Sequence, residues 1–321
     1  FGVGNEGRGT VRPALKDETL KAPEGYPDNS IAVLPFVNMS DDDDNEYFSD
    51  GISEELLNLL ARVHELRVIS RSSAFSFKGK EFDIPTVAQK LNVAHVLEGS
   101  VRKSGNQVRI TAQLIDTESD SHMWSETYDR EMGDIFAIQD EIAASVVEEL
   151  KVRLLGMAPT SEEINPRAYT LYLQARHLGR QYSAETLENS NALYQQLLDI
   201  ERDYAPAWSG LSTNYLNQTA NGLLSSAEGI DLAHSAAERA LAIDPGYAPA
   251  HVNLGAIAHG YHNDAAQAAR HYERALELDP ANTYAIRSAA TLLNSINRPQ
   301  EAIMLGQYFT ARDPVTASGH T

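Results

Sequence analysis

The sequence predicts two parts: a small α/β domain with a mixed sheet and packed helices, followed by an all-α solenoid of repeated helix pairs. Two observations carry this prediction. Up to about residue 157, short apolar runs and amphipathic segments alternate and then give way to a stretch of period two. From Pro166 onward every element is expected to be helical, and similar phrases return about every 34 residues, the period of stacked helix pairs. We therefore expect a linker over 1–29, the α/β domain over 30–157 and the repeats over 158–321.

The α/β domain is expected to open with a strand. The unbroken apolar run "SIAVLPFVN" (30–38) is typical of a strand covered on both faces, and Pro35 should interrupt its pairing because proline has no N–H to donate. The later elements are a helix around 54–63 with Glu54 and Glu55 facing outward, a strand over 66–70, a helix over 83–92 capped by Asp83, a three-strand meander over 94–131 and a helix over 134–155. In "QVRITAQL" (107–114) apolar and polar residues alternate, so one face of that strand should meet water.

The repeats follow from regularly spaced prolines and alanines. Pro245, Pro280 and Pro314 are 35 and 34 residues apart, and an alanine stands twelve residues before each of them: Ala233, Ala268 and Ala302. Small alanines let the two helices of a pair approach closely, and each proline ends a unit. About nine extra residues around 221–229 are expected to form a longer turn. We expect about three and a half repeats, with the chain stopping inside the first helix of another.

Composition bounds the function. The 321 residues carry a formal net charge of −19, so nucleic-acid binding by this chain is disfavoured, because phosphate backbones require a cationic surface. There are no cysteines, which excludes disulfides and thiolate chemistry. The longest clean apolar run, "IAVLPFV", is far shorter than the ~18 residues of a membrane span. Since the chain begins with Phe1, we expect that a segment precedes it.

Two family resemblances cover most of the chain. Residues 166–321 resemble tetratricopeptide repeats, because "YAPAHVNLGAIAH" and the segment after it fill the expected columns with Leu254, Gly255, Ala268, Tyr272, Ala275 and Pro280. Residues 30–155 resemble the TolB-like, also called FlgO-like, amino-terminal domain through "SIAVLPFVNMSDDDDNEYFSDGISEELLNLLA", "LRVISRSSAFSFKGK" and "VAHVLEGSVRKSGNQVRITAQLID".

The second resemblance implies a sensing or assembly region and not an effector. In similar bacterial proteins this domain follows a membrane helix, and upstream of the helix lies a winged-helix DNA-binding domain, a nucleotide cyclase or a kinase. If it holds, 1–29 lies just outside the inner membrane, the rest is extracytoplasmic, and the membrane is reached only through a helix upstream of Phe1.

The acidic stretch "NMSDDDDNEYFSDG" (38–51) is the first candidate site. Four adjacent carboxylates do not converge on one ion without a special loop, and an EF-hand loop counted from Asp41 has Glu46 where its central glycine belongs. Acidic residues before a helix are stabilised by the positive end of its dipole. We therefore interpret the stretch as a solvated loop that caps a helix, with a weak cation site as the alternative.

Two further surfaces are candidate binding sites. A cationic patch for an anion or ligand would combine Arg71, Lys78, Lys80, Arg102, Lys103 and Arg109; the alternative is a solvated sheet edge protected by its charges. The first helices of the repeats would line a partner-binding groove with Ser209, Thr213, Asn217, Val252, Ala256, His259, Arg287, Thr291 and Asn294. Residues 152–321 contain no lysine, which disfavours recognition of a terminal carboxylate by lysines.

Catalytic and metal sites are not predicted. His259 and His262 have helical spacing but lie where a turn is expected, and no G-x-S-x-G elbow occurs. We predict no cofactor. The sequence therefore favours a non-enzymatic sensing and interaction module whose repeats bind a protein or peptide; self-association is left open. The alternative is an α/β domain that binds a small molecule or glycan, with the repeats as scaffold or dimerisation element.

Overall fold

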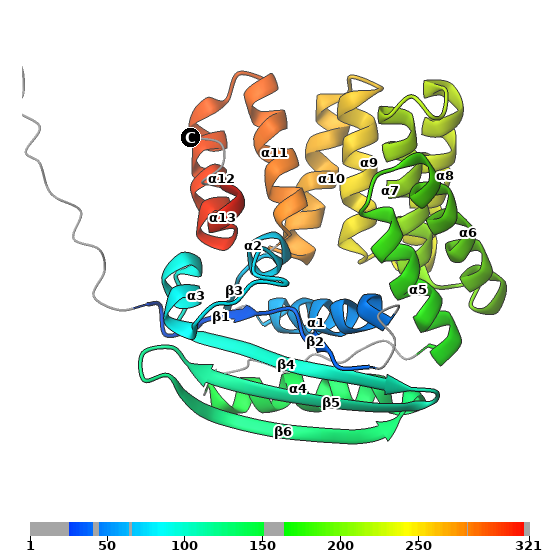
Figure 1. The fold of residues 1–321 in the computed structure, drawn as a ribbon. Coiled ribbons are helices and arrows are strands. Elements are labelled where there is room, and N and C mark those ends of the chain that lie inside the picture. Colours follow the sequence, from blue (N-terminus) through cyan, green and yellow to red (C-terminus); the bar gives the residue numbers. More distant parts are fainter. Residues whose placement is uncertain (1–25, 41–44, 64–65, 151–163, 281, 318–321) are drawn as a thin grey trace, which may run out of the picture.

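The computed structural model describes residues 26–40, 45–63, 66–150, 164–280 and 282–317. The α/β part contains a mixed sheet with helices on it (Figure 1). Its elements are β1 (Ser30–Val33), β2 (Val37–Asn38), α1 (Glu46–Ala61), β3 (Arg67–Val68), α2 (Arg71–Phe75), α3 (Ile84–Leu91), β4 (His95–Ser104), β5 (Gln107–Asp116), β6 (Ser121–Glu131), a 3-10 turn (Met132–Asp134) and α4 (Ile135–Glu149). The α/β prediction is confirmed; α2 was not predicted.

The sheet order is β3-β1-β4-β5-β6, with β2 paired to β4. β1 runs parallel to β3 and β4, whereas β4, β5 and β6 form the expected antiparallel meander. The chain leaves β1 just before Pro35: Leu34 N–H still donates to Leu97 O at 2.9 Å, and pairing resumes in β2. The interruption predicted at Pro35 is therefore confirmed.

Both faces of β1 are buried, as its sequence predicts. Ile31 and Val33 belong to the core that includes α1 and α4, whereas Ala32 and Leu34 belong to a second cluster with residues of α3. Along β5 the apolar positions are buried and Arg109 is exposed, so the wet face of that strand is also confirmed. The helix predicted over 134–155 ends at Glu149, with Leu150 as its C-cap.

The second part is a helical solenoid, as predicted. Four helix pairs are present in the described residues, followed by one short helix. They are α5 (Pro166–Gly179) with α6 (Ala184–Ile200), α7 (Ala205–Ala220) with α8 (Ser226–Ile243), α9 (Ala248–Gly260) with α10 (Ala265–Leu278), α11 (Thr283–Ser295) with α12 (Pro299–Arg312), and α13 (Pro314–Ala317). The small-residue columns behave as expected: Ala233, Ala268 and Ala302 are buried, and Gly255 lies so close to Tyr272 that a Cβ would be 2.4 Å from its ring.

The extra residues of the second repeat do not form a long turn, and that prediction is wrong. α7 and α8 have 16 and 18 residues, against 13 and 14 in α9 and α10, so most of the insertion lengthens the helices. The connection is short because Ser225 caps α8, its Oγ accepting the Glu228 N–H at 3.2 Å. The added turns bury Thr219 and Ile230.

The two parts share one apolar core. Residues of the sheet, α1 and α4 lie in the same cluster as residues of α5, α6 and α7, including Tyr169, Leu173 and Tyr194. Figure 1 shows α5 beside one end of α1, with the solenoid arching over the α/β part and its last helices near α2 and α3. Gly51 of α1 permits the close approach, because a Cβ there would lie 2.6 Å from Leu173 Cδ2.

Gly51→Ala tests this contact. We expect the variant to lower the free energy of unfolding by about 1–3 kcal/mol, because a methyl group forced into a packed core displaces its neighbours. Urea titration measures the change. The control is Gly260→Ala at the end of α9, where a Cβ would meet nothing within 4 Å and the change should stay within about 0.5 kcal/mol. Equal stability of both variants and the parent chain would contradict the close approach.

Candidate functional site

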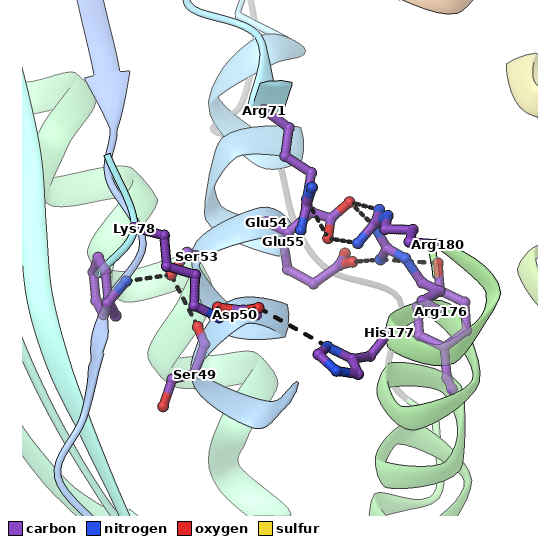
Figure 2. A network of polar contacts seen from close by, with 12 residues as sticks. Ser49, Asp50, Ser53, Glu54, Glu55, Arg71, Lys78, Arg176, His177 and Arg180 are labelled. Carbon is purple, nitrogen blue, oxygen red and sulfur yellow. Dashed lines mark hydrogen bonds and ion pairs between the residues drawn. The ribbon is translucent and has the colours of Figure 1, made fainter. Parts of the chain in front are cut away.

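The main polar site of the described residues lies where α1 meets α5, and we call it the α1–α5 junction (Figure 2). It is built by acidic side chains of α1, cationic side chains of α5, and two cations from α2 and the turn after it. Its members are Asp50, Glu54, Glu55, Arg71, Lys78, Arg176, His177 and Arg180. The sequence analysis selected Arg71 and Lys78 for another role and missed the others, apart from Asp50.

Glu54 is the centre of the junction. Its carboxylate pairs with Arg176 of α5 and with Arg180 at the C-cap of α5, and Arg71 Nε lies 3.2 Å from Glu54 Oε2. The residue is only 5% exposed, so the prediction that Glu54 faces outward is wrong. Burial by itself raises the pKa of Glu54, but the three guanidinium charges outweigh burial and hold the pKa well below the ordinary carboxyl range. Glu54 is therefore ionised at every physiological pH and ties α1, α2 and α5 together.

A second group of charges flanks the centre. Lys78 Nζ lies 2.6 Å from Asp50 Oδ1 and 2.8 Å from a carboxylate oxygen of Glu46. His177 Nδ1 lies 4.0 Å from Asp50 Oδ2. Burial lowers the pKa of His177 although Asp50 opposes that change, so burial disfavours the charged imidazole. Arg176 completes the junction by pairing with Glu55.

Local sequence positions the two helices. α5 begins at Pro166, and Asn165 caps it by accepting the Arg167 N–H at 2.9 Å. α1 is buried on nearly all sides from Phe48 to Glu54, because it lies between the sheet and α5. Its polar residues are consequently enclosed and need partners, since an unpaired buried charge is strongly unfavourable. The junction supplies partners for the buried carboxylates Asp50 and Glu54, whereas Ser49 Oγ has no hydrogen-bond partner among the described residues.

The junction has little room for a ligand. A cavity of about 10 Å³ lies among Tyr47, Gly51, Leu173 and the charged side chains, and a water molecule needs roughly that much space. A larger open depression of about 700 Å³ lies elsewhere, between Asn92 and the outer side of α12. The junction therefore joins parts of the chain and does not enclose a substrate.

The predicted cationic patch is distributed over several places. Arg71 and Lys78 pair with acids of α1, as described above. The other four cations each have a contact of their own: Lys80 Nζ donates to Ser76 O at 2.6 Å, Arg102 Nε donates to Met39 O at 2.9 Å, Lys103 Nζ lies 5.2 Å from the centre of the Phe48 ring, and Arg109 pairs with Asp129 at 2.6 Å. Whether any of them binds an anion stays a prediction.

The predicted groove residues lie on α7, α9 and α11, the first helices of successive pairs. Ser209 and Val252 are 2% and 7% exposed, so these two offer a partner almost no surface and are corrected to packing positions. Of the nine, four are exposed and three are half-buried: Thr213, Arg287, Thr291 and Asn294, then Asn217, Ala256 and His259. Partner binding by these seven stays a prediction.

Two tyrosines at the same face were missed by the sequence analysis. Tyr182 and Tyr284 are 49% and 55% exposed, and their hydroxyl oxygens are 3.5 Å apart. The Arg287 guanidinium stacks on Tyr284 at 4.5 Å from the ring centre. Tyrosine and arginine are enriched at protein interfaces, but only the folded chain brings residues 102 positions apart together.

The acidic loop can be assessed in part. Residues 41–44 lie outside the described residues. Asn45 occupies the N-cap of α1 without a side-chain cap bond, and Glu46 lies in the first turn.

His259 contacts Ser295 Oγ at 3.2 Å. No group of three potential metal ligands occurs in the described part of the chain. None of the helices described there is both long and apolar enough to cross a membrane.

Comparison with known proteins relates the α/β part to regulators. Residues 27–145 match the family model of the HilA/YgeH-like transcriptional regulator, second domain. The chain is also 41% identical over 197 residues to a putative adenylate cyclase 3 of Rhizobium meliloti (strain 1021). That match covers 59% of this chain and 34% of the relative, so the chain spans about a third of that protein's length.

Two solved structures are similar to portions of the chain. A thermophilic TPR protein of Thermus thermophilus is 17% identical with a TM-score of 0.42, covering 56% of this chain and 84% of that one. TolB from Acinetobacter baumannii is 17% identical with a TM-score of 0.29, covering 41% of this chain and 30% of that one. Because both scores lie below 0.5, the fold assignment rests on the helices and strands of the chain itself.

Glu54→Gln tests the centre of the junction. The variant keeps the size of the side chain but leaves three guanidinium groups without their shared carboxylate. We expect it to lower the free energy of unfolding by about 3–5 kcal/mol in urea titrations, as for a broken buried pair. The control is Glu141→Gln, which removes an exposed pair with Arg130 at 3.3 Å and should lower it by less than about 1 kcal/mol. Similar small losses in both variants would contradict the central role of Glu54.

Acid should weaken the junction. Because the pKa of Glu54 is lower in the folded than in the unfolded chain, its contribution is fully present above pH ~5 and is lost as the pH falls below ~4.3, the unfolded value. Urea titrations at pH 7, 5 and 3.5 measure this loss. The Glu54→Gln variant lacks the titrating group and should lose less stability over the same range. An identical pH dependence in both chains would argue against the assignment.

Proposed function

We propose that the chain is a non-enzymatic input module of a bacterial regulatory protein. One observation carries the proposal: the chain is similar both to the second domain of transcriptional regulators and to part of a putative adenylate cyclase. Those two names describe different outputs, DNA-directed regulation and nucleotide cyclisation. A segment that is shared by proteins with these two different outputs fits best as the segment that controls the output. The effector domain that produces the output lies outside these residues.

The repeats suit the receiving end of such a module. Helix-pair solenoids expose extended surfaces on which partners bind, and the exposed residues of α11 together with Tyr182 and Tyr284 supply polar and aromatic contacts there. The shared core and the α1–α5 junction would carry a change in the repeats to the α/β part.

Location is part of the same proposal and rests on the family resemblance alone. We place the module on the extracytoplasmic side of the inner membrane, attached through an upstream membrane helix. A reporter enzyme that is active only outside the cytoplasm, fused after residue 317 of the full-length protein, tests this placement. Activity of a cytoplasm-restricted reporter at that position would contradict it.

In-cell photo-crosslinking tests partner binding. A photoreactive amino acid at exposed Thr291 should crosslink to a discrete protein, because α11 presents that side chain on the predicted groove. The matched control is exposed Glu273 on α10, outside the predicted groove. We expect the crosslinked band from Thr291 only, and we expect Arg287→Glu to remove it. The same pattern from both positions, or no band from Thr291, would contradict the groove assignment.

The alternative, a small-molecule or glycan site in the α/β part, has less support. The cavity at the α1–α5 junction has room for about one water molecule, with a volume of about 10 Å³. The larger depression beside Asn92 is open and is lined mostly by residues of α12. A thermal-shift screen of the whole chain against small molecules and glycans distinguishes this alternative from the proposed input module. A ligand that binds the folded state raises the melting temperature.

A further inference from the structure

The far end of the solenoid returns to the α/β part. Figure 1 shows α13 beside α2 and α3, although they are more than 200 residues apart in the chain. Ser70 N–H donates to Arg312 O at 2.7 Å, and Ser73 Oγ donates to Asp313 Oδ1 at 2.6 Å. Val315 N–H donates in turn to Ser73 Oγ at 3.0 Å. We call this contact of residues 311–315 with α2 and its cap the C-terminal latch.

The latch is buried and specific to the last repeat. Ser73 and Asp313 are 0% and 2% exposed. An aspartate precedes the proline of the second, third and fourth units. In the second and third units it accepts a hydrogen bond within its own turn: Asp244 accepts from Gly246 N–H at 2.8 Å, and Asp279 accepts from Asn282 Nδ2 at 3.1 Å. In the fourth repeat the same position reaches across to the α/β part. The repeat pattern thus places an aspartate at this position, and in the fourth repeat the fold pairs that aspartate, Asp313, with Ser73 of α2.

The five-residue helix α2 takes part in both attachments of the solenoid. Arg71 pairs with Glu54 at the α1–α5 junction, at 3.2 Å. Two residues later, Ser73 holds Asp313 of the latch. The Arg71 guanidinium also stacks on Phe75 at 3.9 Å from the ring centre, within the same helix. A displacement of α2 therefore affects the first and the last repeat together.

We propose that α2 is a mechanical relay between the curvature of the solenoid and the α1–α5 junction. In a solenoid each repeat contacts mainly its neighbours, so a partner that bends α7–α11 moves the α12–α13 end relative to α5. Through the contacts of the latch this movement displaces α2, and Arg71 of α2 then displaces its partner Glu54. This inference deepens the proposed function, because a bound partner would supply the bending force.

Hydrogen exchange of the whole chain, without any partner, tests the relay. Asp313→Asn weakens the latch without touching α1. We expect amides of α1 to exchange at least about fivefold faster in this variant, because the junction opens more often, while amides of α9 keep their rates. Ser73→Ala removes the same contact from the other side and should have the same effect. The control is Asp279→Asn, the matching position of the third repeat, which should leave α1 unchanged.

Two outcomes would overturn the relay. Faster exchange confined to α2 and residues 311–315, with α1 unchanged, would show that the latch is local. Equal acceleration of α1 and α9 would show general destabilisation and not transmission. Because the experiment uses the chain alone, its result is independent of the crosslinking result: a missing groove partner would leave the relay standing, and a failed relay would leave the groove standing.

Discussion

One buried carboxylate connects the two parts of this protein. Glu54 is enclosed between α1 and α5, where an ionised group without partners would be strongly unfavourable. Three arginines from two separate segments compensate for that burial, and all of them must be in place together. Removal of one partner from a buried ion pair of this kind is strongly destabilising, because it leaves an uncompensated charge. It fixes which side of α1 meets the first repeat, and the apolar core shared by both parts follows from that placement.

The remainder of the architecture follows from this constraint. With α5 fixed on α1, the solenoid starts in one direction, and four helix pairs bring its end back to α2 at the C-terminal latch. The arc is thereby attached at both ends. The exposed residues of the first helices lie between the two attachments, so an occupant of that face would act on a chain that is held at two points. An input module would gain from this arrangement, because a local bend then has a defined route to the α/β part.

The sequence predicts the helices, strands and caps that show a periodic or local pattern. Alternation along β5, prolines 35 and 34 residues apart and the cap at Asp83 identify elements because each depends on nearby residues. The junction could not be predicted in this way, since its charges come from positions 54, 71, 176 and 180, and a charged helix face in isolation is typical of a solvated surface. The spacing of Arg176 and Arg180, four residues apart on one face of α5, was the available signal, but nothing in the sequence names their partner. The extra turns of α7 and α8 were misassigned for a related reason: the segment 221–229, with its glycines and serines, is typical of a loop, and only packing shows that the helices on both sides of Gly222 are longer.

The account rests on the claim that the α/β part and the repeats fold as one unit. The chain has two tryptophans, and Trp124 lies on β6 whereas Trp208 lies on α7. Single-tryptophan variants, Trp208→Phe and Trp124→Phe, therefore report on each part separately by fluorescence during urea unfolding. After correction for the small stability change of each substitution, we predict coincident transitions with one midpoint. Two separate transitions, with the repeats losing structure while Trp124 still reports a folded sheet, would contradict the account.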